Sequence, residues 1–250
     1  MQGITKLEKR KIMNIKYINA TNAEKCLIEK VLQFIKRRFP NQYDYKLLHY
    51  IKIADELANN SSAQTREHTI IISRKNGISD VYFEEKEILE SHIYKDKKLH
   101  VVVSTIYHEL WHVNTWKKYQ KLYDYVLDES SDIIKALAYR YWIEYVSHIE
   151  TVCLEEEGCM KQFCLGFVNT RWAKIECGYQ EMLINLPYFL CRAHYLGIYA
   201  NCLNQIESNI ILEIVKSIND ITEELLNNQI MSESEKANVI YKEFQKIYQN

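Results

Sequence analysis

Residues 108–112 read His-Glu-Leu-Trp-His, with two histidines four positions apart and a glutamate directly after the first. On an α-helix, side chains at positions i and i+4 lie one turn apart and point the same way. The imidazoles of His108 and His112 can then both reach one zinc ion at about 2.0–2.1 Å. Glu109 lies about 100° further round the helix, where its carboxylate can take a proton from metal-bound water. The pattern therefore predicts a zinc site that carries its own general base.

The segment around this motif, residues 99–119, is predicted to be a helix with two unlike faces. One face is an apolar stripe at helical spacing, formed by Leu99, Val102, Val103, Ile106, Leu110 and Val113. The two histidines fall on the opposite side, which Trp111 and Trp116 flank, so both faces of the helix are expected to be covered. Buried histidines without partners cost free energy, and a shared metal ion would satisfy them.

Hydrolytic zinc sites usually take three protein ligands and leave the fourth position to water. The long motif with a third histidine six residues after the second is excluded, because that position is Lys118. The next predicted helix, residues 129–153, carries Glu144 at the edge of its apolar arc, while Glu150 points away from it. Glu144 is therefore the predicted third ligand.

His148 is the main alternative, because it lies one turn after Glu144 and within the apolar arc. It is expected to be either the third ligand or a hydrogen-bonding partner of the site. The remaining acidic residues nearby fit better as a loop and N-cap cluster at the start of a helix. They are Asp124, Asp128, Glu129 and Asp132.

The composition narrows the classes of function. The chain has 250 residues, is 47% hydrophobic and 26% charged, and has a net charge of −1. No basic stripe with interleaved aromatic residues is present, so nucleic-acid binding is not expected. No run of about 18 apolar residues is present either, so no membrane span is expected. Seven cysteines without a C-x-x-C pair are typical of reduced thiols, which predicts a cytoplasmic location.

The wider pattern predicts an α+β protein that is mainly α. Six glycines and two prolines favour helices over turn-rich β structure. A helix is predicted over residues 23–39, and after residue 98 every segment is predicted to be helical. Short strands are expected between them, with Asn76-Gly77 as a hairpin turn, at residues 47–54, 69–73, 81–83 and 91–94.

These elements predict a small N-terminal antiparallel sheet packed on the motif helix, followed by a helical C-terminal half. Residues 13–153 are interpreted as a metallopeptidase-like core and residues 154–250 as a helical subdomain. Residues 1–12 are expected to be a flexible tail.

This combination resembles the gluzincin class of zinc peptidases, which join H-E-x-x-H to a glutamate on a later helix. Among compact versions it is most similar to the ImmA/IrrE-type metallopeptidases, in which the later glutamate opens an E-x-x-A-like stretch. That stretch is Glu144-Tyr145-Val146-Ser147 in this sequence, with serine at the small position. The resemblance covers roughly residues 23–153. The sequence departs from the family pattern at Trp111, where a small residue is usual, and at His148, where thermolysin-like relatives carry an acidic residue.

The resemblance implies a zinc endopeptidase that cleaves a protein or peptide substrate, such as a transcriptional repressor. It implies that Glu109 accepts the proton of the attacking water and passes it to the leaving amine. The developing oxyanion needs a donor, for which His194, Tyr195 and Arg192 are candidates. Two other functions stay open: a regulatory zinc protein without proteolytic activity, and a metal-free helical protein in which the motif is accidental.

Overall fold

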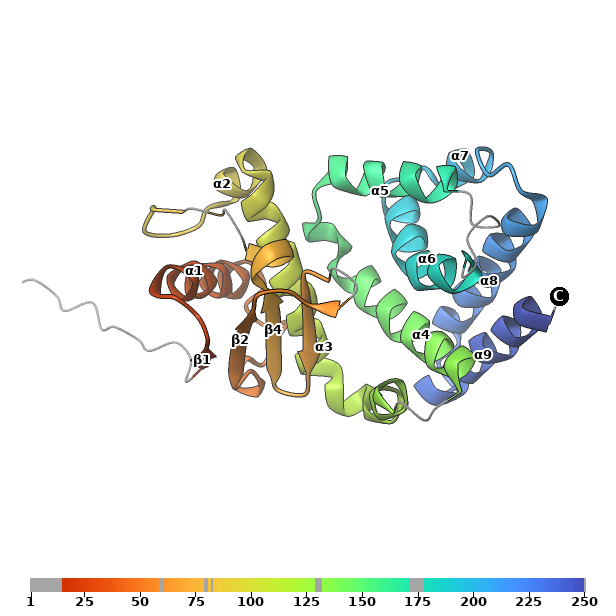
Figure 1. The fold of residues 1–250 in the computed structure, drawn as a ribbon, viewed down its shortest axis with the longest axis horizontal. Coiled ribbons are helices and arrows are strands. Elements are labelled where there is room, and N and C mark those ends of the chain that lie inside the picture. Colours follow the sequence, from red (N-terminus) through yellow and green to blue (C-terminus); the bar gives the residue numbers. More distant parts are fainter. Residues whose placement is uncertain are drawn as a thin grey trace, which may run out of the picture.

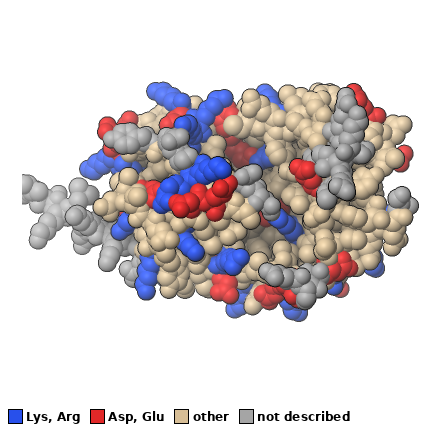
Figure 2. Space-filling view, in the orientation of Figure 1, with Lys and Arg blue, Asp and Glu red and all other residues tan. Residues whose placement is uncertain are grey.

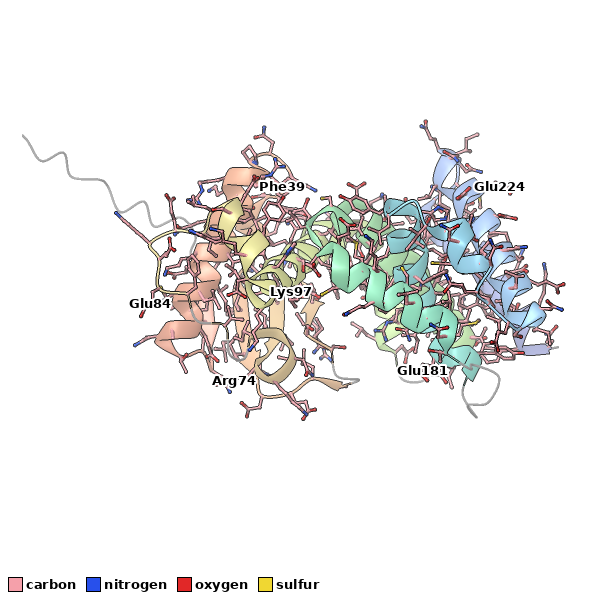
Figure 3. All side chains as sticks on the ribbon, turned by 90° about the horizontal axis from the view of Figure 1, so that it is seen from above. Phe39, Arg74, Glu84, Lys97, Glu181 and Glu224 are labelled. Atoms are coloured by element: carbon pink, nitrogen blue, oxygen red, sulfur yellow. The ribbon has the colours of Figure 1, made fainter. Side chains whose placement is uncertain are left out.

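The structure is a computed structural model, and the predicted tail of residues 1–12 lies outside the part that it describes. The described residues are 15–58, 61–78, 81, 83–128, 132–170 and 178–249. Figure 1 shows an α/β half that contains the sheet, followed by a half built from helices alone. Figure 3 gives the view from above, with Arg74 in the first half and Glu181 and Glu224 in the second. The predicted α+β class with mainly helical content is confirmed.

The sheet has four strands in the order β1-β2-β4-β3, and it is mixed rather than antiparallel. β1 and β2 are parallel, β2 and β4 are parallel, and only β3 and β4 are antiparallel. The predicted antiparallel sheet is therefore wrong for two of these three pairings. The strands are β1 (Lys16–Ile18), β2 (Tyr50–Ala54), β3 (Ala63–Arg66) and β4 (Thr69–Ser73).

The parallel pairing of β1 and β2 follows from the helix between them, because parallel neighbours need a crossover connection. That helix, α1 (Asn22–Arg38), starts at Thr21, whose hydroxyl accepts from the backbone N–H of Glu24 in a capping box. The core face of the sheet is made of isoleucines that are at most 1% exposed and share one core with α1. They are Ile51, Ile53, Ile70 and Ile72.

The segment between the sheet and the motif helix is not β structure. Residues Arg74–Ile78 form a π-helical turn, and Glu90–Lys95 form helix α2, so the strand predicted over residues 91–94 is wrong. Val81 and Phe83 lie in no strand either. Residues 91–94 read Ser-His-Ile-Tyr, and so short a segment cannot distinguish one helical turn from a strand by its pattern.

Asn76 and Gly77, predicted as a hairpin turn, lie within the π-helical turn Arg74–Ile78 instead. A Cβ atom at Gly77 would lie 2.6 Å from the carbonyl oxygen of Ser62. The glycine is thus needed for close packing of the turn against the segment before β3, where any larger side chain would clash.

The helical part is organised around two long helices. α3 (Lys97–Leu127) starts at Asp96, and α4 (Ile133–Thr151) starts at Asp132, each with its side chain accepting backbone N–H groups. α4 packs against α3 on one side and against α6 and α9 on the other, as Figure 1 shows. The remaining helices are α5 (Glu157–Asn169), α6 (Gly178–Tyr195), α7 (Tyr199–Leu203), α8 (Asn209–Asn227) and α9 (Glu233–Gln249).

On the face seen in Figure 2, lysine and arginine side chains are interspersed with aspartate and glutamate. Among the described residues, the helices include none with the length and apolar character needed to cross a bilayer.

Candidate metal centre

The structure brings the three predicted metal ligands together. His108 and His112 lie on α3 and Glu144 on α4, and one ligand atom from each lies within 4.8 Å of the others. The Nε2 atoms of the two histidines are 2.9 Å apart. One carboxylate oxygen of Glu144, Oε2, is 3.4 Å from Nε2 of His108 and 3.8 Å from Nε2 of His112. Two imidazoles and one carboxylate are a donor set used by catalytic zinc sites, which keep a fourth position open.

The distance between the two Nε2 atoms is also that of a hydrogen bond between the rings. Two nitrogens bound to one tetrahedral zinc at about 2.05 Å each would be roughly 3.3 Å apart. The 2.9 Å separation of His108 and His112 is shorter, and it matches a hydrogen bond between the two rings. Binding of an ion would therefore replace a proton that the two rings share.

A hydrogen bond on the outer side of His108 orients its ring. Nδ1 of His108 lies 3.2 Å from the hydroxyl oxygen of Thr151, and that hydroxyl donates to the carbonyl of Ser147 at 2.8 Å. Because the hydroxyl proton is already used, Thr151 accepts from an N–H at Nδ1 when the ring is neutral. That tautomer leaves the Nε2 lone pair free for a metal, an arrangement that is usual for metal-binding histidines.

A hydrogen bond at Nδ1 also orients the ring of His112. Its Nδ1 lies 2.6 Å from the hydroxyl of Tyr123. The ring of Tyr123 stacks on Trp116 with ring centroids 4.0 Å apart, and Trp111 meets His112 edge-on at 5.3 Å. The aromatic residues that flank the motif thus pack around the ligand, so the bulky Trp111 forms a wall of the site.

The electrostatics favour one proton, or one cation, among these three side chains. Burial lowers the pKa of His112 to about 3. Burial also opposes charge on His108, but the hydrogen bond and the negative charge of Glu144 outweigh it and raise its pKa. For Glu144, burial favours the neutral acid, yet His112, His108 and Arg140 hold its pKa well below the usual range. A divalent cation would bind to the same ionised carboxylate and release the His108 proton.

Glu109 lies beside the three ligands and is not one of them. Its carboxylate is 6% exposed, and Oε2 accepts a hydrogen bond from the hydroxyl of Thr65 at 2.7 Å. Burial raises the pKa of Glu109 to about 7. Thr65 lies in β3, so the sheet fixes the carboxylate that the sequence predicts as the general base.

His148 is close to the ligands but is bound elsewhere through one of its nitrogens. Its ring lies 4.5 Å from the ring of His108, and its Nε2 is 3.2 Å from Oε1 of Glu155. Oε2 of Glu155 in turn accepts from Nε of Arg192 at 2.6 Å. His148 is therefore a neighbour of the site, while Glu144 belongs with His108 and His112 to the group that could hold a metal ion.

The predicted oxyanion donors His194 and Tyr195 are not brought to the three ligands. Nε2 of His194 is 2.8 Å from Oδ1 of Asn219 on α8, and its ring stacks on Tyr199 at 4.3 Å. Tyr195 is 53% exposed at the end of α6. The α6 residue that faces the site is Tyr188, which lies one to two turns earlier.

Sequence reasoning missed several residues around the ligands. Tyr188 packs against His148 with ring centroids 4.5 Å apart and interacts with Glu144 and Arg140. Arg140 precedes Glu144 by one helical turn and Thr151 follows it by two turns, so the spacing of α4 could have indicated both. Of the acidic alternatives, Asp132 is the N-cap of α4, as predicted, and Glu129 lies outside the described residues.

Comparison with known proteins adds no relative. No protein family, no curated protein and no solved structure matches this chain. The functional argument therefore rests on the side chains of the site.

Proposed function

We propose that this protein is a zinc-dependent endopeptidase that hydrolyses peptide bonds in a specific protein. The observation that carries the proposal is the position of Glu109, which is buried beside the histidine–histidine–glutamate cluster without belonging to it. A structural metal centre has no need for a separate carboxylate with a pKa near neutrality. A hydrolytic centre does need one, because a general base works best when its pKa is close to the working pH.

Each residue of the site would have a separate role in the reaction. His108, His112 and Glu144 hold the zinc, which supplies Lewis acidity when bound. Glu109 accepts a proton from the attacking water and delivers it to the nitrogen of the leaving amine. Thr65 holds the carboxylate of Glu109 for this transfer through its 2.7 Å hydrogen bond.

The sheet offers a place for an extended substrate. β3 is an edge strand of the sheet, and Thr65 connects it directly to Glu109. An extended peptide that added to this edge would run beside the general base, because edge strands bind peptides through backbone hydrogen bonds. The side chains of His108 and Glu144 are 16% and 18% exposed, so the metal position is reachable from solvent.

The resemblance to gluzincins, and to ImmA/IrrE-type peptidases in particular, supports the same reaction. It also motivates the proposal that the substrate is an intracellular regulatory protein such as a transcriptional repressor. The six cysteines among the described residues are unpaired, and free thiols are usual in the cytoplasm.

The alternative function is a regulatory protein that keeps zinc for stability. The observation that favours it is the ring of His148 against His108, because a fourth protein ligand would close the position that water needs. The pairing of His148 with Glu155 supports the open site instead.

The test compares wild-type protein with Glu109→Gln, both loaded with zinc, on a library of unstructured peptides read by mass spectrometry. The proposal predicts cleavage by the wild type and a loss of about 10²–10⁴-fold in the variant, with unchanged zinc content. Zinc binding without any cleavage by the wild type would favour the regulatory alternative. Equal cleavage by both proteins would mean that Glu109 is not the base.

A further inference from the structure

The proposed mechanism leaves one buried histidine of the site without a role. His148 lies on α4 one helical turn after Glu144, and its ring packs between those of His108 and Tyr188. Its Nδ1 atom is buried and has no hydrogen-bond partner in the part of the chain that the structure describes. A buried polar atom left without a partner costs free energy of folding. This cost indicates a partner that the chain itself does not supply.

The other nitrogen of the ring is firmly held. Nε2 of His148 is 3.2 Å from Oε1 of Glu155, and Arg192 donates to Oε2 of the same carboxylate at 2.6 Å. Burial favours the neutral form of Glu155, but the hydrogen bond from His148 and the charge of Arg192 lower its pKa to about 2. An ionised carboxylate can only accept, so Nε2 of His148 carries the proton. On a neutral ring, Nδ1 is then an acceptor.

A chain of three polar side chains, in which His148 is buried and Glu155 and Arg192 are only 16% and 17% exposed, is a costly way to fill space. A phenylalanine at position 148 would pack against the neighbouring rings without needing Glu155 or Arg192 as partners. The arrangement instead fixes the plane and the tautomer of the ring, and it leaves one acceptor atom on a ring that packs against His108.

We propose that Nδ1 of His148 accepts a hydrogen bond from an N–H or O–H group that is bound at the metal position, with Glu155 and Arg192 as positioning residues. This inference rests on the proposed function. The donor that a peptidase site supplies is the amide N–H of the bound peptide, and a water molecule at the metal is the second source of the same chemistry.

The first experiment uses two zinc-binding probes, a dipeptide hydroxamate with a free amide N–H and its N-methylated analogue. Calorimetry measures their affinities for the zinc-loaded wild type, for His148→Phe, and for the control His194→Phe, whose histidine pairs with Asn219 on α8. If the amide is the donor, the wild type and the control prefer the N–H probe by about 10-fold, the value of one hydrogen bond. In His148→Phe the preference falls below about two-fold.

The second experiment follows the ring nitrogens of His148 by ¹⁵N NMR. A shift of the Nδ1 resonance that appears only with the N–H probe identifies the amide as the donor. A shift with zinc alone identifies water, in which case both probes bind His148→Phe and the wild type alike. Replacement of Glu155 by leucine is expected to turn the single Nε2–H tautomer into a mixture, and this signature would not arise from a purely structural role.

Three results would overturn the inference. An Nδ1 resonance that moves in neither arm would show that no donor binds there. A loss of zinc affinity of more than about 10-fold in His148→Phe would make His148 a ligand. Failure of the wild type to take up zinc would overturn the proposed function itself, and this would be seen before any probe is added.

Discussion

Helix α4 contributes to two interfaces that bury polar groups in opposite ways. Toward α8 and α9, the hydroxyl of Tyr141 meets that of Thr222 at 2.9 Å, and Nε1 of Trp142 donates to Glu233 at 2.7 Å. Toward α3 and α6, the same helix places Glu144, which is 18% exposed, beside the buried His148, whose Nδ1 has no hydrogen-bond partner within the described part of the chain. The first interface pairs Tyr141 and Trp142 within the chain, and the second leaves Nδ1 of His148 without a partner among the described residues.

The comparison teaches that burial alone does not distinguish a core from a site. Both interfaces are lined by tyrosine and tryptophan, and residues of both belong to one continuous hydrophobic core. The two interfaces differ in whether each buried polar group has a hydrogen-bond or charge partner. Evolved cores rarely keep buried polar groups without partners. Proteins tolerate such groups where function requires them, at a cost in stability.

The largest effect on stability is expected at the interface of α4 with α8 and α9. Phe244 of α9 is fully buried and meets Tyr141 with ring centroids 5.7 Å apart. Phe244→Ala should lower the free energy of unfolding by about 3–5 kcal/mol, because it removes a large side chain and leaves a cavity. Zinc content of the folded variant should stay at the wild-type value, measured by metal analysis beside a denaturation curve. A variant that folds normally but loses zinc would mean that the two interfaces are coupled.

The free energy of unfolding contributed by the interface of α4 with α3 and α6 should depend on pH. The pKa of Glu155 is lowered from 4.5 to about 2, so its ionised form stabilises the fold at any pH above about 4.5. This contribution, up to about 3 kcal/mol, is lost as pH falls from 4.5 toward 2. The difference in unfolding free energy between the wild type and Glu155→Gln should therefore shrink over that range. A difference that is constant with pH would contradict the ionised pair of Glu155 with Arg192.

A smaller effect, on zinc affinity, is expected at Thr151, the hydrogen-bond partner of the proposed metal ligand His108. Thr151→Val removes the oxygen that accepts from Nδ1 of His108 but keeps the shape of the side chain. Zinc affinity should fall by about 10-fold, since outer partners of this kind are usually worth 10–100-fold. Thr222→Val is the matched control, because it removes a buried hydroxyl from the other interface and should leave zinc affinity unchanged. Equal affinities in both variants would contradict the proposed orientation of the His108 ring.

Sequence reasoning located the centre of the site because helical spacing is a local property. The positions of His108, Glu109 and His112 follow from one helix, and Glu144 follows from the edge of an apolar arc on the next. Thr65 and Tyr188 could not be found in this way, because they reach the site from β3 and α6 through tertiary packing. The oxyanion donors predicted at His194 and Tyr195 lay on the right helix but on a part of it that meets α8 and solvent.

The fold was predicted best where patterns were long. The long helices were predicted, and the class was confirmed, whereas the sheet topology and the segment over residues 74–95 were not. β1 has three residues and β3 is largely polar, so neither shows a hydrophobic period that a sequence reading can use. Parallel pairing depends on how α1 crosses over the sheet, which no strand sequence encodes by itself.

The most direct test of the central claim is the zinc content of protein purified without chelators, with Glu144→Ala measured in parallel. The account predicts one zinc ion per wild-type chain and a clear loss in the variant, because Glu144 contributes the third ligand atom beside His108 and His112. A well-folded wild type that takes up no zinc, even when the metal is added back, would contradict the account. The two histidines would then be helix packing.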